Sequence, residues 1–249
     1  MRLTLPIFVL VFVVSCTTTQ YATLNLAYNP SMETTHPQQE EVRIALLKPV
    51  YTTAVQRAIQ QLSLSPFGSL MEQAMPPDYR LKSKYNKEYV LRLQNAMLAD
   101  LERIIADKGL KVYKSYTSLD EIPYSDKKNI DLVMLPEFDI APIITNKRSV
   151  IPVVGVKRDE GVIQLAGRVK LTFLEPMSKE KIVIKNIDVT SLGINNSVTY
   201  KSSKDADNQL ITLLNETYPA LMEKIDTLID AQEIANSLKD IRHLKEKYR

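Results

Sequence analysis

A helical segment between two strand-like segments is the feature that most constrains the fold of this chain. Apolar residues within residues 84–108 recur every three or four positions, which places them on one face of a helix. Gly109 follows as a typical helix stop. Residues 42–50 and 110–116, on either side of the helix, have the apolar content or the alternation of strands. This order predicts a crossover connection, right-handed if the two strands are parallel neighbours.

Three further segments predict strands of the same sheet. Residues 130–144 contain a dense apolar strand. Residues 162–174 and 181–189 have the pattern of an antiparallel pair joined by a turn at residues 175–180. The sheet is therefore predicted to be mixed and largely antiparallel.

Helical patterns complete the predicted domain. A long helix is expected over residues 205–247, with Pro219 kinking it or marking a boundary. Residues 52–83 have helical spacing interrupted by prolines, which predicts two short helices or a flap that covers the core or offers a binding surface. The predicted fold class is α+β: a mixed, largely antiparallel sheet packed with a crossover helix and a long C-terminal helix, in one domain over residues 42–249.

The N-terminus has the layout of a secretory signal. Arg2 precedes an apolar run of about a dozen residues, well short of the roughly 20 that a membrane-crossing helix needs. The run ends in Val-Val-Ser-Cys at Cys16, the only cysteine. This order resembles the lipobox of bacterial lipoproteins, whose cysteine receives a diacylglycerol and becomes the new N-terminus. We expect residues 1–15 to be removed and the membrane to hold the chain through Cys16, the alternative being an uncleaved anchor or a buried terminal strand.

Residues 16–41 are predicted to be a lipid-attached tether followed by an extended segment. The first few residues after Cys16 are polar. Leu24, Leu26 and Tyr28 then alternate with less apolar neighbours, which indicates a short strand or an extended strip laid on the body. The positions that follow, up to residue 41, contain few apolar residues and predict a loop.

Composition argues against several classes of function. The net charge is only +3, and removal of Arg2 lowers it by one, so binding to nucleic acid has no electrostatic support. A lipidated Cys16 leaves no thiol for a disulfide or for thiol chemistry. His36 and His243 are the only histidines, and no HExxH motif or cluster of histidine and cysteine occurs, so no metal site is predicted.

The sequence predicts no enzyme and no cofactor. It has no GxSxG elbow and no glycine-rich phosphate loop, and isolated glycines such as Gly167 are expected to serve turns or bulges. Glu137 and Asp139 flank Phe138 in a predicted strand, so alternation places both carboxylates on one face. Such a pair could perform acid–base chemistry or glycoside hydrolysis. The preferred interpretation is an exposed strand face, where carboxylates are common.

One motif is specific enough to indicate a family. Residues 169–178, VKLTFLEPMS, resemble the VKxTxLEPMS stretch of the neuraminyllactose-binding haemagglutinin (HpaA) lipoprotein family. Residues 24–30 resemble that family's early LxLxYxP segment, and residues 44–49 resemble its first core strand, which ends in a basic residue and proline. A helix ending in glycine, a KV-containing strand and a long charged C-terminal helix also agree. The longer region at residues 52–83 marks the chain as a divergent paralogue.

The resemblance implies an outer-membrane or cell-surface lipoprotein, associated with the flagellar sheath. Its expected role is structural or binding rather than catalytic. Its expected partners are the membrane, through the lipid on Cys16, and other envelope or flagellar-sheath proteins. The alternative is a surface adhesin that recognises sialylated glycans.

A short basic segment is the candidate glycan site. The family's proposed binding stretch has the form KRTIQK, and its nearest match here is Lys147-Arg148-Ser149. An arginine can bind the carboxylate of sialic acid through two parallel hydrogen bonds, and a hydroxyl adds a further hydrogen bond. These residues also have the composition of an ordinary solvated loop between strands. A second basic pair, at positions 157 and 158, is followed directly by two acids that it can neutralise.

Overall fold

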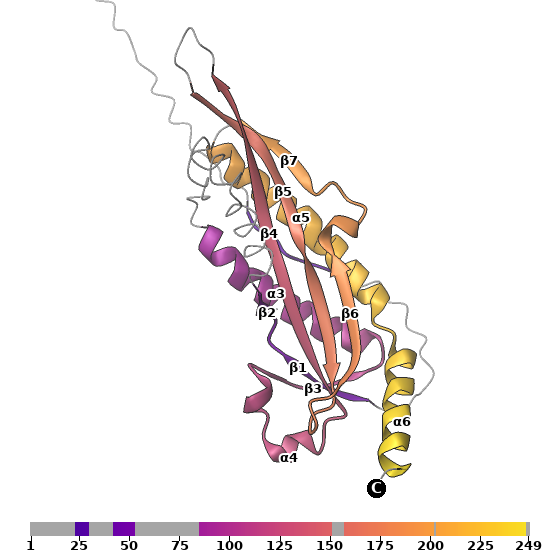
Figure 1. Ribbon diagram of the computed structural model, residues 1–249. Helices are drawn as coiled ribbons and strands as arrows, with labels where there is room; N and C mark the ends of the chain where they lie inside the picture. Colours follow the sequence, from indigo (N-terminus) through magenta and orange to yellow (C-terminus); the bar gives the residue numbers. More distant parts are fainter. Residues whose placement is uncertain (1–22, 30–41, 53–84, 151–156, 202, 248–249) are drawn as a thin grey trace, which may run out of the picture.

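One mixed sheet of seven strands organises the part of the chain that the structure describes (Figure 1). The computed structural model describes residues 23–29, 42–52, 85–150, 157–201 and 203–247. The segment predicted as an insertion at residues 52–83 therefore lies outside the described residues, apart from Thr52.

The strand order is β3-β1-β4-β5-β6, with β2 paired to β4 and β7 paired to β5. Strand β1 runs parallel to β3 and β4, and β2 runs parallel to β4. Strand β5 runs antiparallel to β4, β6 and β7. The strands are β1 (Arg43–Leu47), β2 (Val50–Tyr51), β3 (Lys111–Tyr116), β4 (Leu132–Val150), β5 (Lys157–Leu174), β6 (Lys181–Asp188) and β7 (Ser197–Tyr200).

Helix α3 (Tyr85–Asp107) confirms the predicted helix between two strands. It lies in the connection that leads from β1 through β2 to β3, and β1 and β3 are parallel neighbours as a crossover requires. The helix ends before Gly109, whose φ of 76° is the left-handed conformation that favours glycine at a helix end. Its predicted apolar face is buried: Leu93, Met97, Leu101 and Ile104.

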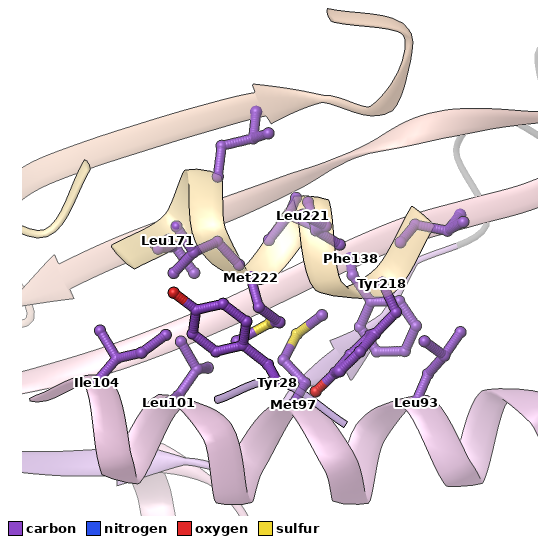
Figure 2. Close-up of a cluster of buried hydrophobic side chains, with 14 of the residues drawn as sticks. Tyr28, Leu93, Met97, Leu101, Ile104, Phe138, Leu171, Tyr218, Leu221 and Met222 are labelled. Carbon is purple, nitrogen blue, oxygen red and sulfur yellow. The ribbon is translucent and has the colours of Figure 1, made fainter. Parts of the chain in front are cut away.

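The main apolar layer lies between one face of the sheet and two helices, α3 and α5 (Ser203–Leu228). Figure 2 shows side chains from all three sources meeting there, with Phe138 and Leu171 from the sheet facing Met97 and Met222 from the helices. These four side chains are essentially inaccessible to solvent. The mixed α+β architecture predicted from the sequence is confirmed.

The other face of the sheet is only partly covered. Ala45 and Leu47 of β1 point to it and form a small second cluster with Tyr116, Ile122 and Val133. The connection between β3 and β4, which holds η1 (Leu119–Glu121) and α4 (Tyr124–Lys127), packs over this end. Beyond it, exposed side chains of β5 and β6 such as Arg168 and Ile184 lie on this side, which we call the open face.

The antiparallel strands confirm the predicted pairing but extend further than expected. β5 and β6 are joined by the predicted turn, in which the Glu175 carboxylate accepts hydrogen bonds from the main-chain N–H groups of Met177 (3.0 Å) and Ser178. β4 continues to Val150 rather than ending near residue 144, because it pairs continuously with β5 as far as Lys157. The charged residues of both strands do not stop this ladder.

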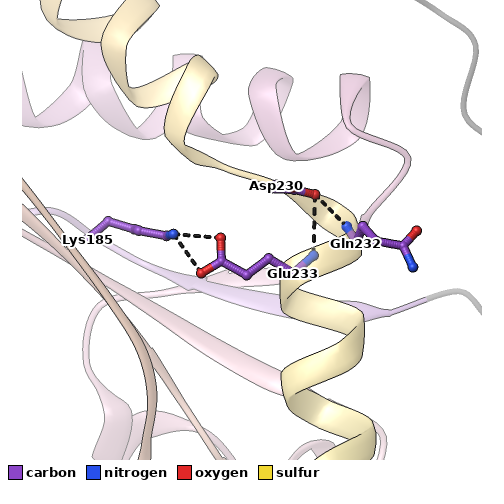
Figure 3. A network of polar contacts seen from close by, with 4 residues as sticks. All are labelled: Lys185, Asp230, Gln232 and Glu233. Carbon is purple, nitrogen blue, oxygen red and sulfur yellow. Dashed lines mark hydrogen bonds and ion pairs between the residues drawn. The ribbon is translucent and has the colours of Figure 1, made fainter.

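The C-terminal region predicted as one long helix consists of two helices, and Pro219 marks no boundary between them. Pro219 lies inside α5, and the break falls instead between α5 and α6 (Ala231–Lys247). Asp230 explains the position of the break, because its carboxylate accepts the N–H groups of Gln232 (2.8 Å) and Glu233 (3.3 Å) and so caps the new helix (Figure 3). The ammonium of Lys185 in β6 binds Glu233 at 2.6 Å and holds α6 beside the sheet.

Residues 23–29, which we call the strap, confirm the predicted extended strip. They belong to no strand, yet Leu24 and Tyr28 are buried in the main apolar layer, and Leu26 packs partly against it. The alternate residues of the strap are exposed. A strip with one buried edge needs no sheet partner where side chains supply its hydrogen bonds.

Gly167 permits an unusually close approach of β4 and β5. Its φ is 134°, and a β-carbon built at this position would lie 1.6 Å from the main-chain oxygen of Asp139. The register between the two strands continues unbroken through Gly167 and its partner Ile140. The predicted turn or bulge is therefore wrong for Gly167, and a glycine is needed there because a side chain would collide with the neighbouring strand.

We predict that Gly167→Ala lowers the free energy of unfolding by about 3 kcal/mol or more, since it adds overpacking against rigid backbone to an unfavourable φ. Gly193→Ala is the matched control. Gly193 also has a positive φ, of 71°, but no atom lies within 4 Å of the position that a β-carbon would take there. It should cost only about 1 kcal/mol. Urea unfolding of both variants measures the difference, and equal losses would contradict this account of Gly167.

Candidate binding site on the long hairpin

The β4–β5 hairpin extends past the rest of the described sheet (Figure 1). Strand β7 pairs with β5 at positions 161–164 and reaches no further than Gly161. Beyond this point β4 and β5 pair only with each other among the described strands, as far as Val150 and Lys157. This extension contains the basic segment that the sequence singles out.

Lys147, Arg148 and Ser149 lie in strand β4, so the interpretation as a loop between strands is wrong for their backbone. Lys147 is opposite Glu160 in the register, and Arg148 is opposite Asp159. Directly opposed residues of antiparallel strands have β-carbons about 4.5–5.5 Å apart. Asp159 and Glu160, which follow the second basic pair in the sequence, therefore lie opposite the first basic pair in the sheet.

The register also regroups the basic positions by face. Successive positions of a strand alternate between the two faces of a sheet. Positions 147 and 149 of β4 share a face with positions 158 and 160 of β5, which lie opposite them. Position 148 belongs to the other face with positions 157 and 159. Each face thus combines two basic positions and one acidic position, and each has an excess of one positive charge.

The open face carries charged pairs closer to the centre of the sheet. Glu137 and Asp139 share this face, as alternation predicts, while Phe138 points into the main apolar layer. Glu137 is half-buried and binds the ammonium of Lys170 at 2.8 Å. Asp139 is only 1% exposed, which corrects the expectation of two exposed carboxylates.

Asp188 marks the end of β6 on the same side of the sheet. Its carboxylate accepts hydrogen bonds from the Thr190 hydroxyl at 2.6 Å and from the Thr190 main-chain N–H at 2.8 Å. These two bonds, and the nearby positive charge of Arg168, hold the pKa of Asp188 below its usual range. The carboxylate is accordingly committed to a local turn and is a poor candidate for proton transfer.

One asparagine of α5 binds the main chain of the strap at two positions. The Asn215 side chain accepts a hydrogen bond from the Asn25 N–H at 2.8 Å and donates one to the Thr23 carbonyl at 2.9 Å. An amide side chain that donates and accepts in this way imitates a neighbouring strand. It satisfies main-chain groups of the strap for which no partner strand is present in the described sheet.

Tyr28 connects the strap to both helices (Figure 2). Its hydroxyl donates to Asp226 of α5 at 2.9 Å, and Lys108, just after α3, binds the other oxygen of the same carboxylate at 2.9 Å. The guanidinium of Arg103 in α3 donates to the Tyr28 carbonyl at 2.5 Å. Two charged side chains therefore bind Tyr28 directly, and Lys108 pairs with one of them.

A second buried carboxylate joins α3 to α5. Asp100 of α3 accepts a hydrogen bond from the Tyr218 hydroxyl of α5 at 2.5 Å and forms an ion pair with Arg103. Burial and the carboxylate acceptor raise the pKa of Tyr218, and the same two causes raise the pKa of Tyr28 through Asp226. Both tyrosines thus stay protonated and donate hydrogen bonds to carboxylates.

The remaining predictions concern Cys16, a metal site and membrane-spanning helices. Cys16 lies outside the described residues. Within the ranges that the structure describes, no group of three or more histidine, cysteine, aspartate or glutamate side chains could hold a metal ion. No helix among the described residues is long and apolar enough to cross a membrane.

The sequence of this chain matches a known family of bacterial proteins. The model of the neuraminyllactose-binding hemagglutinin precursor family matches residues 73–248, which is more than half of the chain. This chain therefore belongs to the neuraminyllactose-binding haemagglutinin family.

Individual relatives agree with this assignment. The neuraminyllactose-binding hemagglutinin of Helicobacter pylori strain 26695 is 25% identical over 195 residues, covering 69% of this chain and 75% of that protein. The protein of strain J99 is 24% identical over the same shares. The crystal structure of a neuraminyllactose-binding hemagglutinin homologue from H. pylori is similar with a TM-score of 0.58 at 16% identity, over 89% of this chain and 100% of that one. The chain is thus a divergent member of the family.

Proposed function

We propose that this chain is a lipid-anchored, non-catalytic envelope protein that acts by binding, held at the outer membrane or the flagellar sheath through Cys16. Family membership and the lipobox-like residues that end at Cys16 support this. The observation that carries the proposal is the strap. It begins seven residues after Cys16 and is hydrogen-bonded to α3 and α5, so a lipid would be connected firmly to the folded body. An anchor with two or three acyl chains suffices for stable attachment, whereas one chain is marginal.

We predict that Cys16→Ser releases the protein from the membrane fraction, because serine cannot form the thioether that carries the diacylglycerol. Thr17→Ser, one position further on, should leave membrane retention unchanged. Fractionation after an alkaline wash, with mass spectrometry of the N-terminal peptide, measures both variants. Full retention of Cys16→Ser after the wash would refute the lipid anchor.

The second candidate function, recognition of sialylated glycans, is favoured by the regrouping of basic positions on the hairpin. Relatives in H. pylori are named for binding neuraminyllactose. In our proposal Lys147, Ser149 and Arg158 form the contact surface, since they share one face and Ser149 is opposite Arg158. Two cations and a hydroxyl suit a sialic acid, whose carboxylate accepts from the cations and whose hydroxyls pair with serine and with Glu160.

The two faces of the hairpin provide a test with equal losses of charge. We predict that the double variant Lys147→Ala with Arg158→Ala weakens binding to sialyllactose by about tenfold or more, because each hydrogen bond to a charged group contributes about 1.5–3 kcal/mol. The double variant Arg148→Ala with Lys157→Ala removes the same charge from the other face and should change binding less than about threefold. Binding to immobilised glycans at two salt concentrations measures both.

Two results would overturn the glycan proposal. The first is a folded wild-type chain that binds sialyllactose no better than unsubstituted lactose. The second is an equal loss in the two double variants, which would indicate attraction by net charge rather than a site on one face.

A further inference from the structure

The strap lies on one side of a two-layer molecule, and this determines which side can approach a membrane. Arg103 of α3 and Asn215 of α5 both bind its main chain, so it runs between the two helices. Thr23, Asn25 and Ala27 are exposed, whereas Leu24 and Tyr28 are buried toward the sheet. The exposed edge of the strap therefore belongs to the outer surface of the helix layer.

The chain before the strap is too short to reach freely around the molecule. Cys16 precedes Thr23 by seven residues, which can span at most roughly 25 Å when fully extended. A helix layer is about 10 Å thick, and the sheet lies about another 10 Å beyond it. A path from Thr23 to the open face must also run around an edge of the domain, which takes it beyond this reach.

We propose that the helix layer of α3 and α5 faces the bilayer and that the open face of the sheet is turned away from it. This inference rests on the lipid anchor at Cys16 proposed above, and its partner is the surface of that same bilayer. The orientation follows from the docked strap, because a loose segment of 14 residues from Cys16 to Asn29 would allow the body to turn. It leaves Ile184, Arg168 and the hairpin positions 147, 149 and 158 on the side open to other ligands.

The absence of tryptophan from the chain makes this orientation measurable. Ala99 is exposed on the outer side of α3, and Ile184 is 46% exposed on the open face. Ala99→Trp and Ile184→Trp each introduce one indole into the full-length chain, expressed with its own N-terminal segment and purified in detergent. Each variant is reconstituted in phosphatidylcholine vesicles that contain a dansyl-labelled lipid, and energy transfer from indole to dansyl reports its distance from the membrane.

We expect transfer from Ala99→Trp to be at least about twofold more efficient than from Ile184→Trp, because two layers separate these positions. Adding Leu24→Ser and Tyr28→Ser to each variant should undock the strap and reduce the difference. Equal transfer from both indoles, or stronger transfer from Ile184→Trp, would overturn the proposed orientation.

The experiment tests the lipid anchor and the orientation of the domain separately. Mass spectrometry of Cys16 reports whether the lipid is present, whatever the transfer shows. If the thiol is unmodified, the lipid proposal fails, and the same variants are coupled through Cys16 to a maleimide lipid before reconstitution. Transfer then tests whether the strap orients the body, with the same expected and contradicting results.

Discussion

Two buried carboxylates determine how the helix layer and the strap must fit together. Asp100 and Asp226 lie within or beside the main apolar layer and are 3% and 8% exposed. A buried charge is costly unless it is paired and hydrogen-bonded. Their partners come from different segments: Tyr218 from α5, Lys108 and Arg103 from the region of α3, and Tyr28 from the strap. Displacing any one segment would leave a carboxylate with fewer partners in a dry environment.

Local patterns in the sequence predict the framework of this fold well. The spacing of apolar residues in α3 and the glycine that follows it depend on near neighbours, and both are confirmed. The break at Asp230 is not predicted, because a carboxylate that caps a new helix resembles any other acid of a long helical pattern. A kink or a boundary was expected at Pro219, and the structure has no boundary there. The full length of the hairpin is not predicted, because a run of charged residues is compatible both with an exposed loop and with paired strands.

The candidate site depends on information that the sequence does not contain locally. Lys147 and Arg148 are adjacent in the chain, and this adjacency suggested a joint contact. The register separates them and brings Arg158 opposite Ser149, which only the pairing of β4 with β5 can determine. The contacts of Tyr28 likewise join positions about 200 residues apart. The alternation of apolar residues predicts that this strip lies on the body. It does not indicate that Asp226 accepts the hydrogen bond of the tyrosine hydroxyl.

If the strap is part of the folded body, removing it should lower the stability of the whole domain. Comparing the urea midpoints of chains that lack residues 1–22 and residues 1–29 tests this most directly. Burial of Leu24 and Tyr28 contributes about 1.5–3 kcal/mol each, partly offset by the entropy of ordering the strap. We expect an unchanged midpoint after the first deletion and a clearly lower midpoint after the second. Equal midpoints would contradict it.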